Sequence, residues 1–448
     1  MIPFRRPRTV AVLLAAAALV SSALAAAPAQ AGENMDIAVQ DEAVLQYQSY
    51  FDRARAYTLL RNMNASRVRF NAVWASLNRR QNKQKSVPKT PVYDFGTLDN
   101  AIEVARSQGM KVQLSLTGQT PAWAAGNKKL TAQGTVRPNA KLYAQFVKTV
   151  VDRYKGRVDA YSIWNEPNHK GWLQPLKEQA SLYRKLYEAA YPVIRKADPA
   201  ARILIAETAP YPSKKTVATP PLRFLRELAC VDKAYAPLKG KKCKPLIADA
   251  YAHHPYDYTR PPNQPYPGAD NVSMGGLPRL ENVLNRLARR KRLMSPSGTA
   301  LNLWLTEFGY FARKETGREK VYPESTRAKY LVQAFEIARK DPRVEVMLQF
   351  LLVEYPKGLF RFNTSIVKLN GKPMRTYAKL ASWGRKAGAR GQIASPGPVV
   401  QPVPPGNGGG GQTPPGQTPP GQMPPPQNPP PQNPPPPACT LPPPLPCV

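Results

Sequence analysis

Residues 158–168 read VDAYSIWNEPN, an apolar run that ends in Asn165, Glu166, Pro167 and Asn168. β-Branched and aromatic residues dominate the run and predict a buried strand, and the polar residues mark the end of that strand. Seven more runs of this kind lie along the chain. The eight predicted strands begin near residues 35 (MDIAVQ), 67 (RVRFNAVW), 110 (MKVQLSL), 158 (VDAYSIW), 202 (RILIAE), 246 (LIADAYAH), 301 (LNLWLTE) and 344 (VEVMLQFLLVE).

Segments with helical periodicity separate these strands. In residues 97–109, Leu98, Ile102 and Ala105 fall on one helical face, and Gly109 is a typical helix end. Similar segments are found at 139–154, 178–197, 277–293 and 325–340. Alternating strands and helices predict a parallel sheet covered by helices, and eight repeats predict an α/β protein with a (β/α)8 TIM barrel.

An open, doubly wound sheet is the alternative fold. Such a sheet normally carries a glycine-rich phosphate-binding turn after its first strand, whereas residues 40–52 here read QDEAVLQYQSYFD and contain no GxGxxG. The barrel is therefore favoured. Catalytic side chains of a barrel lie at the C-terminal ends of its strands, so the residues that close each run are the first candidates for a site.

Composition divides the chain into three regions. Residues 1–31 combine a basic start, an Ala/Leu/Val run and a final AQA, as expected for a signal peptide cleaved after Ala31. A membrane anchor is the alternative for this run, and the Sec and twin-arginine routes both stay open. Residues 32–395 suit one barrel domain, and the uncharged, Pro/Gly/Gln-rich residues 396–448 predict a disordered tail. We therefore expect a secreted or cell-wall-associated monomer without a transmembrane segment after cleavage.

Four cysteines form two close pairs, Cys230 with Cys243 and Cys439 with Cys447. In an exported chain such pairs predict disulfides. Neither pair has CxxC spacing, and the three histidines form no HExxH motif. A catalytic metal is therefore not expected, and the sequence indicates no other cofactor.

The sequence carries 64 lysines and arginines against 29 acidic residues, a formal net charge of +35. A surface of this charge attracts anionic polymers, such as those of a cell wall. A solvated basic surface suited to an acidic envelope explains the charge equally well. Because no nucleic-acid-binding module accompanies the charge, nucleic acid is not an expected partner.

Two glutamates close predicted strands. Glu166 follows the fourth run, and Glu307 follows the seventh in WLTEFGY, residues 304–310. The ends of strands four and seven of a closed barrel lie across the same cavity, so two carboxylates would face one mouth. Hydrolysis of a glycosidic bond needs such a pair, because the leaving oxygen must gain a proton while the anomeric carbon is attacked from the opposite side.

By these two motifs, residues 33–390 resemble clan A glycoside hydrolases, particularly families 5 and 39. Those families carry Asn-Glu-Pro at strand four and an acidic residue in a Thr-Glu-Phe-Gly-like context at strand seven. The resemblance implies a retaining enzyme in which Glu166 is the acid/base, Glu307 is the nucleophile and Asn165 hydrogen-bonds the sugar 2-hydroxyl.

Two further matches add substrate-binding candidates. Arg69 in the second strand resembles the clan's arginine, which orients the nucleophile and keeps it ionised; a salt bridge without a catalytic part is the alternative. The sixth strand closes in HHPY, which resembles the clan's His-x-Tyr and implies that His254 and Tyr256 contact the catalytic centre. Neighbouring side chains of a strand point to opposite sides, so only one histidine can face the interior, and His254 is favoured over His253.

Strands five and eight leave questions open. Glu207 at the end of strand five either binds substrate or pairs with an arginine. The families often place a tryptophan at the end of strand eight, where this chain reads QFLLVEY at 349–355, so the platform under the sugar is not predicted. Core packing is favoured over sugar stacking for each aromatic residue near the rim: Trp74, Trp123, Trp172, Tyr310, Phe350 and Tyr355.

The leading hypothesis is a secreted retaining glycosidase that hydrolyses O-glycosidic bonds of β type in a polysaccharide or oligosaccharide. The alternative is a non-catalytic envelope protein that binds an anionic cell-wall glycan, and the presence of both glutamates favours the enzyme. The sugar is not predicted, because the long inserts at 117–137, 210–244 and 257–276 match no specificity pattern.

Overall fold

The structure is a computed structural model that describes residues 34–126, 135–212, 217–240, 242–317 and 319–387. The predicted signal peptide, the predicted Pro-rich tail and the predicted Cys439–Cys447 disulfide lie outside these residues. Within them, no helix combines the length and apolar character that crossing a membrane requires.

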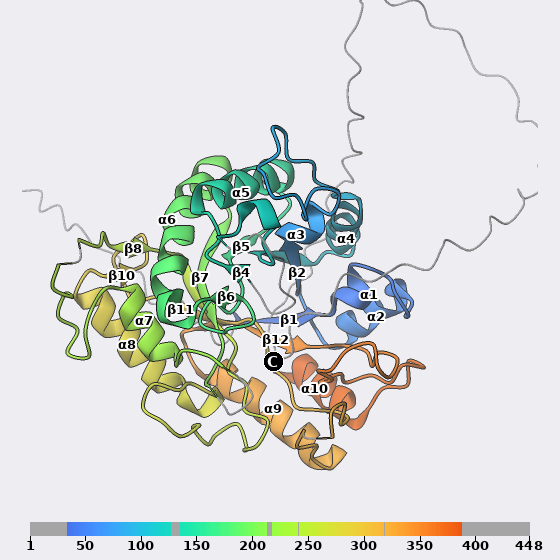
Figure 1. Cartoon of the computed structure of the whole chain (residues 1–448). Coiled ribbons are helices and arrows are strands. Elements are labelled where there is room, and N and C mark those ends of the chain that lie inside the picture. The colour runs from blue at the N-terminus through green and yellow to red at the C-terminus, as the bar shows by residue number, and fades with distance from the viewer. Residues whose placement is uncertain (1–33, 127–134, 213–216, 241, 318, 388–448) are drawn as a thin grey trace, which may run out of the picture.

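Parallel strands of the described residues close into a barrel in the order β1-β12-β11-β9-β7-β5-β3-β2, which confirms the predicted TIM barrel (Figure 1). The barrel strands are β1 (Asp36–Gln40), β2 (Arg67–Val73), β3 (Lys111–Thr117), β5 (Ala160–Ile163), β7 (Arg202–Thr208), β9 (Ala250–His253), β11 (Asn302–Leu305) and β12 (Val344–Phe350). The first and last of these strands pair directly and close the cylinder.

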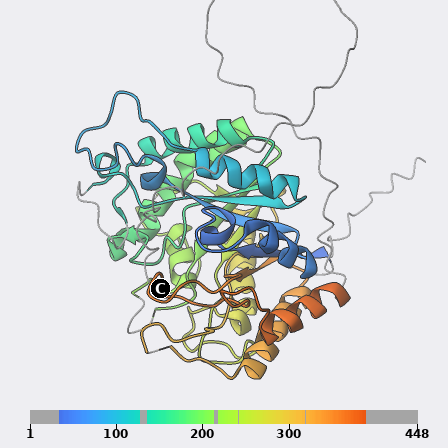
Figure 2. The same cartoon turned by 90° about the vertical axis from the view of Figure 1, so that its right-hand side faces the viewer.

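Helices surround the barrel on its outside, as the two views in Figures 1 and 2 show. Three of them begin at capping side chains: Asp41 accepts from Val44 N at 3.3 Å, Asp52 accepts from Arg55 N at 2.7 Å, and Asn139 accepts from Leu142 N at 3.1 Å. The helices are α1 (Glu42–Leu45), α2 (Arg53–Asn62), α3 (Trp74–Leu77), α4 (Gly96–Ser107), α5 (Ala140–Tyr154), α6 (Gln179–Ala197), α7 (Pro221–Leu228), α8 (Leu277–Arg289), α9 (Glu324–Lys340) and α10 (Arg375–Lys386). The predicted helical segments correspond to α4, α5, α6, α8 and α9.

The predicted strand at 246–253 is wrong in one respect, because the structure divides it. Only its second half is the barrel strand β9; its first half, β8 (Leu246–Ile247), pairs with β10 (Leu293–Met294) outside the barrel. Asp249 lies between the two halves in the chain, and its carboxylate accepts a hydrogen bond from Ile203 N at 2.7 Å. A second small sheet joins β4 (Thr135–Val136) and β6 (Leu173–Gln174).

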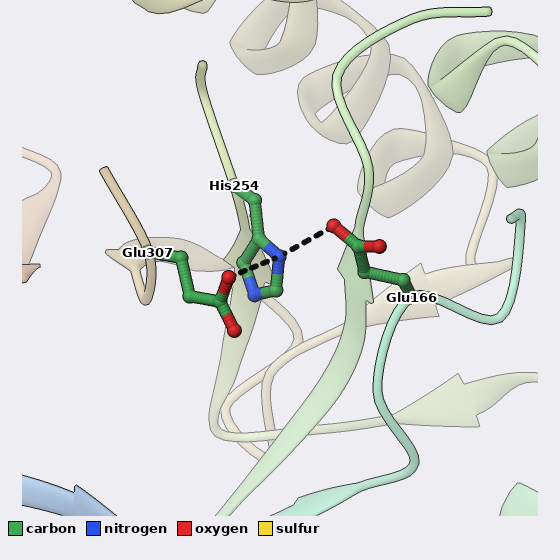
Figure 3. A group of neighbouring side chains, drawn as sticks. All are labelled: Glu166, His254 and Glu307. Carbon is green, nitrogen blue, oxygen red and sulfur yellow. Dashed lines mark hydrogen bonds and ion pairs between the residues drawn. The ribbon is translucent and has the colours of Figure 1, made fainter. Parts of the chain in front are cut away.

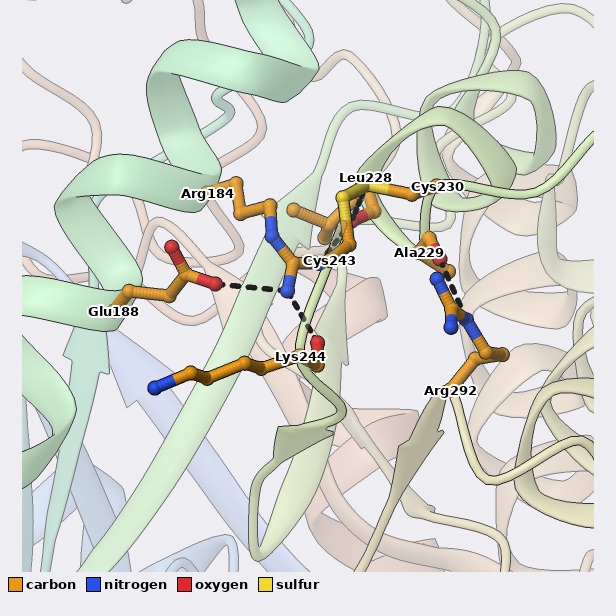
Figure 4. Close-up of a disulfide and its surroundings, with 8 residues drawn as sticks. All are labelled: Arg184, Glu188, Leu228, Ala229, Cys230, Cys243, Lys244 and Arg292. Atoms are coloured by element: carbon orange, nitrogen blue, oxygen red, sulfur yellow. Dashed lines mark hydrogen bonds and ion pairs between the residues drawn. A yellow bond between two sulfur atoms is a disulfide. The ribbon is translucent and has the colours of Figure 1, made fainter. Parts of the chain in front are cut away.

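The predicted disulfide between Cys230 and Cys243 is confirmed, with the two Cα atoms 6.3 Å apart (Figure 4). It closes a loop after α7. Arg292 donates from Nε to the carbonyl of Ala229 at 3.2 Å, beside the bridge. A loop of this size contributes about 3 kcal/mol of stability in the chain-entropy model.

Polar side chains lie in the barrel interior near the C-terminal ends of the strands. On β2, Val68 and Phe70 are buried among apolar neighbours, whereas Arg69 between them reaches side chains of β3 and β7. This alternation follows from the period of two in a strand. Charged and polar groups therefore meet on the barrel axis, below the C-terminal ends of the strands.

Candidate active site

Glu166 and Glu307 face each other across the barrel mouth (Figure 3). Glu166 lies just beyond the end of β5 and Glu307 just beyond the end of β11, which is where the sequence predicts them. One side-chain atom each of Glu166, His254 and Glu307 lies within 4.8 Å of the other two. Both carboxylates are buried, with 1% and 8% of the residue exposed. The two predicted glutamates thus form one compact pair.

Arg69 links the second strand to both sides of this mouth. Its Nη1 lies 2.8 Å from Oε1 of Glu307, and its Nη2 lies 2.7 Å from Oδ1 of Asn165. Nη1 also donates to the side-chain oxygen of Gln40. Arg69 is fully buried, so its ion pairs lie in the barrel interior and not at the rim.

Tyr256 approaches Glu307 from another side. Its hydroxyl donates to Oε2 of Glu307 at 3.2 Å, so each carboxylate oxygen of Glu307 accepts one hydrogen bond. The ring is buried and stacks on Phe308 at 6.1 Å between centroids. The structure thus brings Tyr256, Arg69 and Glu307 together.

His254 and His253 have different surroundings. Nδ1 of His254 lies 2.8 Å from Oε1 of Glu166 and 3.7 Å from Oε2 of Glu307. His253 instead contacts Thr208 Oγ1 at 2.9 Å and the carbonyl of Val272 at 3.1 Å. His254 is therefore the histidine that contacts both glutamates.

Glu207 pairs with Arg69, one of the two alternatives left open by the sequence. Its Oε2 lies 2.8 Å from Nη2 of Arg69, and it also accepts from Gln113 at 2.8 Å, Ser115 at 2.7 Å and Ser162 at 2.9 Å. Burial acts to raise the pKa of Glu207, but Arg69 and the hydrogen bonds outweigh it and hold the pKa below its ordinary value. Glu207 is thus a fixed anion beneath the mouth.

Burial raises the pKa of Glu166 and of Glu307. The charge of Glu207 acts in the same direction on both, and Glu166 also raises the pKa of Glu307. The pair therefore titrates in two coupled steps. Glu307 accepts hydrogen bonds from Arg69 and Tyr256, which favour its ionised form.

The backbone that carries these side chains is strained. Trp164, Glu166, Ala206 and Glu207 all have positive φ values, of 70°, 38°, 86° and 44°. Non-glycine residues in this region cost about 1–3 kcal/mol each and persist only where their surroundings hold them. Glu166 N donates to the carbonyl of Glu207 at 3.1 Å, so the two strained strand ends hold each other in place.

Several polar neighbours of the site were not singled out from the sequence. His169 is buried and lowers the pKa of Glu166 through its charge, against the larger effect of burial. Glu42 accepts from Gln40 at 2.6 Å and from Asn71 at 2.5 Å, beside Arg69. The only signal for Glu42 and Asn71 in the sequence was a polar residue near the end of the first or second strand. No motif marks either position.

The aromatic residues named from the sequence are all buried, as favoured for core residues. Trp74 stacks on Phe146 at 5.3 Å between centroids and meets Trp123 edge to face at 5.6 Å. Trp172 is the one that lies beside Glu166. No platform for a sugar is therefore assigned to strand eight, where Phe350 is 4% exposed.

Glu166, His254 and Glu307 also offer three donors of the kinds that bind zinc. The guanidinium of Arg69 already places a positive charge on Glu307, and Glu166 is hydrogen-bonded to His254. Both glutamates thus have partners on the protein itself, and the expectation of a metal-free centre stays a prediction.

Two solved structures share the barrel fold with this chain. A family 39 glycoside hydrolase from the gut symbiont Bacteroides cellulosilyticus WH2 superposes with a TM-score of 0.57 at 17% identity, over 79% of this chain and 64% of that one. A glucosidase from Croceicoccus marinus gives a TM-score of 0.50 at 14% identity, over 76% of this chain and 64% of that one. At these identities the likeness shows the fold alone.

Sequence comparison gives a local match and a longer one. A β-1,4-xylanase from Dictyoglomus thermophilum is 35% identical over 82 residues, which are 18% of this chain and 21% of the xylanase. This chain thus spans about a fifth of that relative, and less than two thirds of the two solved structures. The family model described as Cellulase (glycosyl hydrolase family 5) matches residues 31–261, more than half of the 448-residue chain, including Arg69 and Glu166. The chain therefore belongs to glycosyl hydrolase family 5.

Proposed function

We propose that this protein hydrolyses β-glycosidic bonds by double displacement, with Glu307 as the nucleophile and Glu166 as the acid/base. The observation that carries the proposal is the approach of the two carboxylates to within 4.8 Å. Retaining glycosidases hold their carboxyl groups about 5–5.5 Å apart, whereas inverting enzymes need about 6.5–9.5 Å to admit a water molecule. The short separation supports the retaining mechanism.

The surroundings of Glu307 suit a nucleophile. Its two oxygens accept from Arg69 at 2.8 Å and from Tyr256 at 3.2 Å. These donors stabilise the carboxylate that must attack the anomeric carbon, and they fix its direction. Burial opposes the ionisation of Glu307 and raises its pKa, whereas His254 and the cation of Arg69 favour the ionised form.

The surroundings of Glu166 suit an acid that must first hold a proton. Burial raises its pKa, and Oε2 has no hydrogen-bond partner among the described residues, whereas Oε1 contacts His254. When Oε2 carries the proton, it can donate that proton to the leaving group. Asn165 is bound to Arg69 through Oδ1, which leaves its Nδ2 group to donate to the sugar 2-hydroxyl.

The substrate class follows from the family and the local relative. A β-1,4-linked glycan, with xylan as the first candidate, is favoured by the match to a β-1,4-xylanase. The signal-like residues 1–31 favour hydrolysis outside the cell. Aryl β-xylosides and β-glucosides, together with xylan and cellulose, form the panel that tests this choice.

Azide rescue separates the two glutamate roles. Glu307→Gly lacks the nucleophile, so azide should restore turnover and give a product of inverted anomeric configuration. Glu166→Ala still forms the intermediate from an activated aryl glycoside, so azide should give a product of retained configuration. Glu42→Gln is the control, because this buried carboxylate lies near Arg69 and has no role in bond cleavage; azide should not change its rate.

Proton NMR spectra of the products show whether the anomeric configuration is inverted or retained. The same anomer from both glutamate variants, or wild-type rates in either, would remove the assignment. Binding of an anionic cell-wall glycan by the intact protein without turnover of any glycoside would favour the alternative of a non-catalytic envelope protein.

A further inference from the structure

Two basic segments that are far apart in the sequence lie together on the outer wall of the barrel. The first, residues 233–244, reads KAYAPLKGKKCK; its described residues up to Cys243 belong to the loop that the Cys230–Cys243 disulfide closes, and residue 241 lies outside the described residues. The second, residues 286–292, reads RLARRKR and spans the end of α8. Both bring several cations into one region, although like charges repel each other.

Three connections hold these segments side by side. The Cys230–Cys243 bridge closes the first segment, and the pairing of β8 with β10 aligns the residues that follow each segment. Arg292 then ties the end of α8 to Ala229 by its hydrogen bond of 3.2 Å (Figure 4). The proximity of the two segments is thus fixed by the fold.

A pocket of about 180 Å³ lies between them and is lined by Ala234, Tyr235, Arg286, Arg289 and Arg290. We call it the basic pocket. Arg289 and Arg290 are exposed, and among the described residues their side chains have no hydrogen-bond or ion-pair partner. Arg286 donates to Asn282 at 2.9 Å and lies 5.2 Å from the ring centre of Tyr235. The nearby Asp232 accepts from backbone amides of its own loop instead of pairing with an arginine.

The basic pocket is at the opposite end of the barrel from the catalytic pair. Residues 230–248 lead into the start of β9, and residues 290–301 lead into the start of β11. Glu307 and His254, by contrast, follow the ends of these same two strands. A ligand in the basic pocket therefore leaves the mouth free. The insert at 210–244 therefore places its disulfide-closed part away from the barrel mouth.

We propose that the basic pocket binds the carboxylate or phosphate groups of an acidic polysaccharide, and so holds the protein on that glycan independently of catalysis. Guanidinium groups bind carboxylate and phosphate groups through two parallel hydrogen bonds, and three guanidinium groups line this one small pocket. An acidic polysaccharide fits the basic pocket because its carboxylate or phosphate groups extend one at a time from an uncharged sugar chain.

Two other polyanions fit the surroundings less well. Proteins that bind single-stranded nucleic acids offer exposed aromatic rings on which the bases stack. Tyr235 is only 8% exposed, and Arg286 lies over its ring. Anionic membranes are bound most firmly where apolar side chains accompany the cations. The exposed large apolar side chains of the described residues are Val87, Val92, Val217, Leu359 and Leu369, none of which lines the pocket.

Affinity electrophoresis of the full-length protein through gels containing polygalacturonate or a phosphorylated mannan tests the proposal, with neutral xylan as the reference. The pocket variant is Arg286→Gln/Arg289→Gln/Arg290→Gln. The matched control is Lys141→Gln/Lys329→Gln/Lys379→Gln, which removes the same net charge from exposed positions on α5, α9 and α10. Melting temperature and turnover of a neutral aryl glycoside check that each variant is folded.

Wild-type protein should bind at least one acidic glycan, with an affinity that falls steeply with salt. The pocket variant should lose at least tenfold in affinity, and the control variant less than twofold, with turnover unchanged in both. Carboxylate and phosphate binding are distinguished by which gel retards the protein. Equal losses in the two variants would show diffuse charge attraction, and no retardation by either acidic gel would also overturn the proposal. Tighter, pocket-dependent binding of single-stranded DNA or of anionic vesicles would replace the glycan by that partner.

Discussion

Nη1 of Arg69 lies 2.8 Å from Oε1 of Glu307, and the guanidinium has no exposure to solvent. Arg69→Met should therefore leave Glu307 and the buried Glu207 without their counter-charge. Removing one partner of a buried ion pair costs about 3–5 kcal/mol, which urea denaturation measures. Without Arg69, the pKa of Glu307 should rise, and the acid limb of kcat/KM should move to higher pH.

Arg67 provides the matched control for this change. It belongs to the same strand and donates to Asp36 at 2.9 Å, but Asp36 also contacts Lys111 at 3.0 Å. Arg67→Met should cost less stability and leave the acid limb in place. An unchanged pH profile in the Arg69 variant would contradict the role given to this guanidinium.

Variants of the two adjacent histidines are expected to differ in the pH dependence of kcat. The neutral ring of His254 can donate from Nδ1 to ionised Glu166, an interaction that lowers the pKa of the acid. In His254→Ala this donor is lost, so the alkaline limb of kcat should move to higher pH, and kcat should fall about tenfold as Glu166 loses its orientation.

His253→Ala should leave the alkaline limb of kcat unchanged. Burial lowers the pKa of His253 to about 3, and the neutral ring is bound to Thr208 and Val272. Its loss should cost about 1–3 kcal/mol in unfolding free energy through unpaired buried groups. A shifted limb in the His253 variant alone would reverse the choice between the two histidines.

Gly309 is expected to tolerate no side chain. A Cβ atom there would lie 2.8 Å from the carbonyl oxygen of Phe350 and 2.8 Å from Cβ of Thr364. Gly309→Ala should displace the segment that carries Glu307, costing about 1–3 kcal/mol of stability and lowering kcat more than KM. Gly96→Ala is the control, because its nearest contact would be 3.6 Å, and calorimetry should show little change. Full activity of Gly309→Ala would show that the segment adapts.

Stability should also depend on the half-buried Glu281. Burial, together with Asp341, raises its pKa to about 7 in the folded protein, above the ordinary value of 4.5. A raised carboxyl pKa stabilises the fold below pH 4.5 and loses that contribution as pH rises to about 7. Relative to Glu281→Gln, the wild type should thus lose about 1 kcal/mol between these pH values, after allowance for solvent screening. Glu103→Gln, on the exposed face of α4, should keep the wild-type trend.

A chelator should leave activity unchanged. Arg69 supplies the positive charge beside Glu307, so EDTA treatment followed by dialysis should not alter kcat. Loss of activity that zinc restores would show that Glu166, His254 and Glu307 bind an ion.

The sequence was sufficient for the barrel and for the positions of Glu166 and Glu307, because both follow apolar runs whose period and order are local properties. It was not sufficient for Glu207, whose partner Arg69 is contributed by a strand on the other side of the interior. It also merged β8 with β9, because only the distant β10 reveals that the first half pairs elsewhere. Contacts between residues remote in sequence leave no local pattern from which to predict them.

The pairing of β1 with β12 has a consequence for how the chain folds during synthesis. Asp36 of the first strand aligns with Val346 of the last, so the cylinder cannot close until nearly the whole domain has left the ribosome. Until then β1 presents an unpaired strand edge, which invites association with other chains. Slowing translation just before β12 should therefore favour aggregation, whereas the same pause after residue 387 should be harmless.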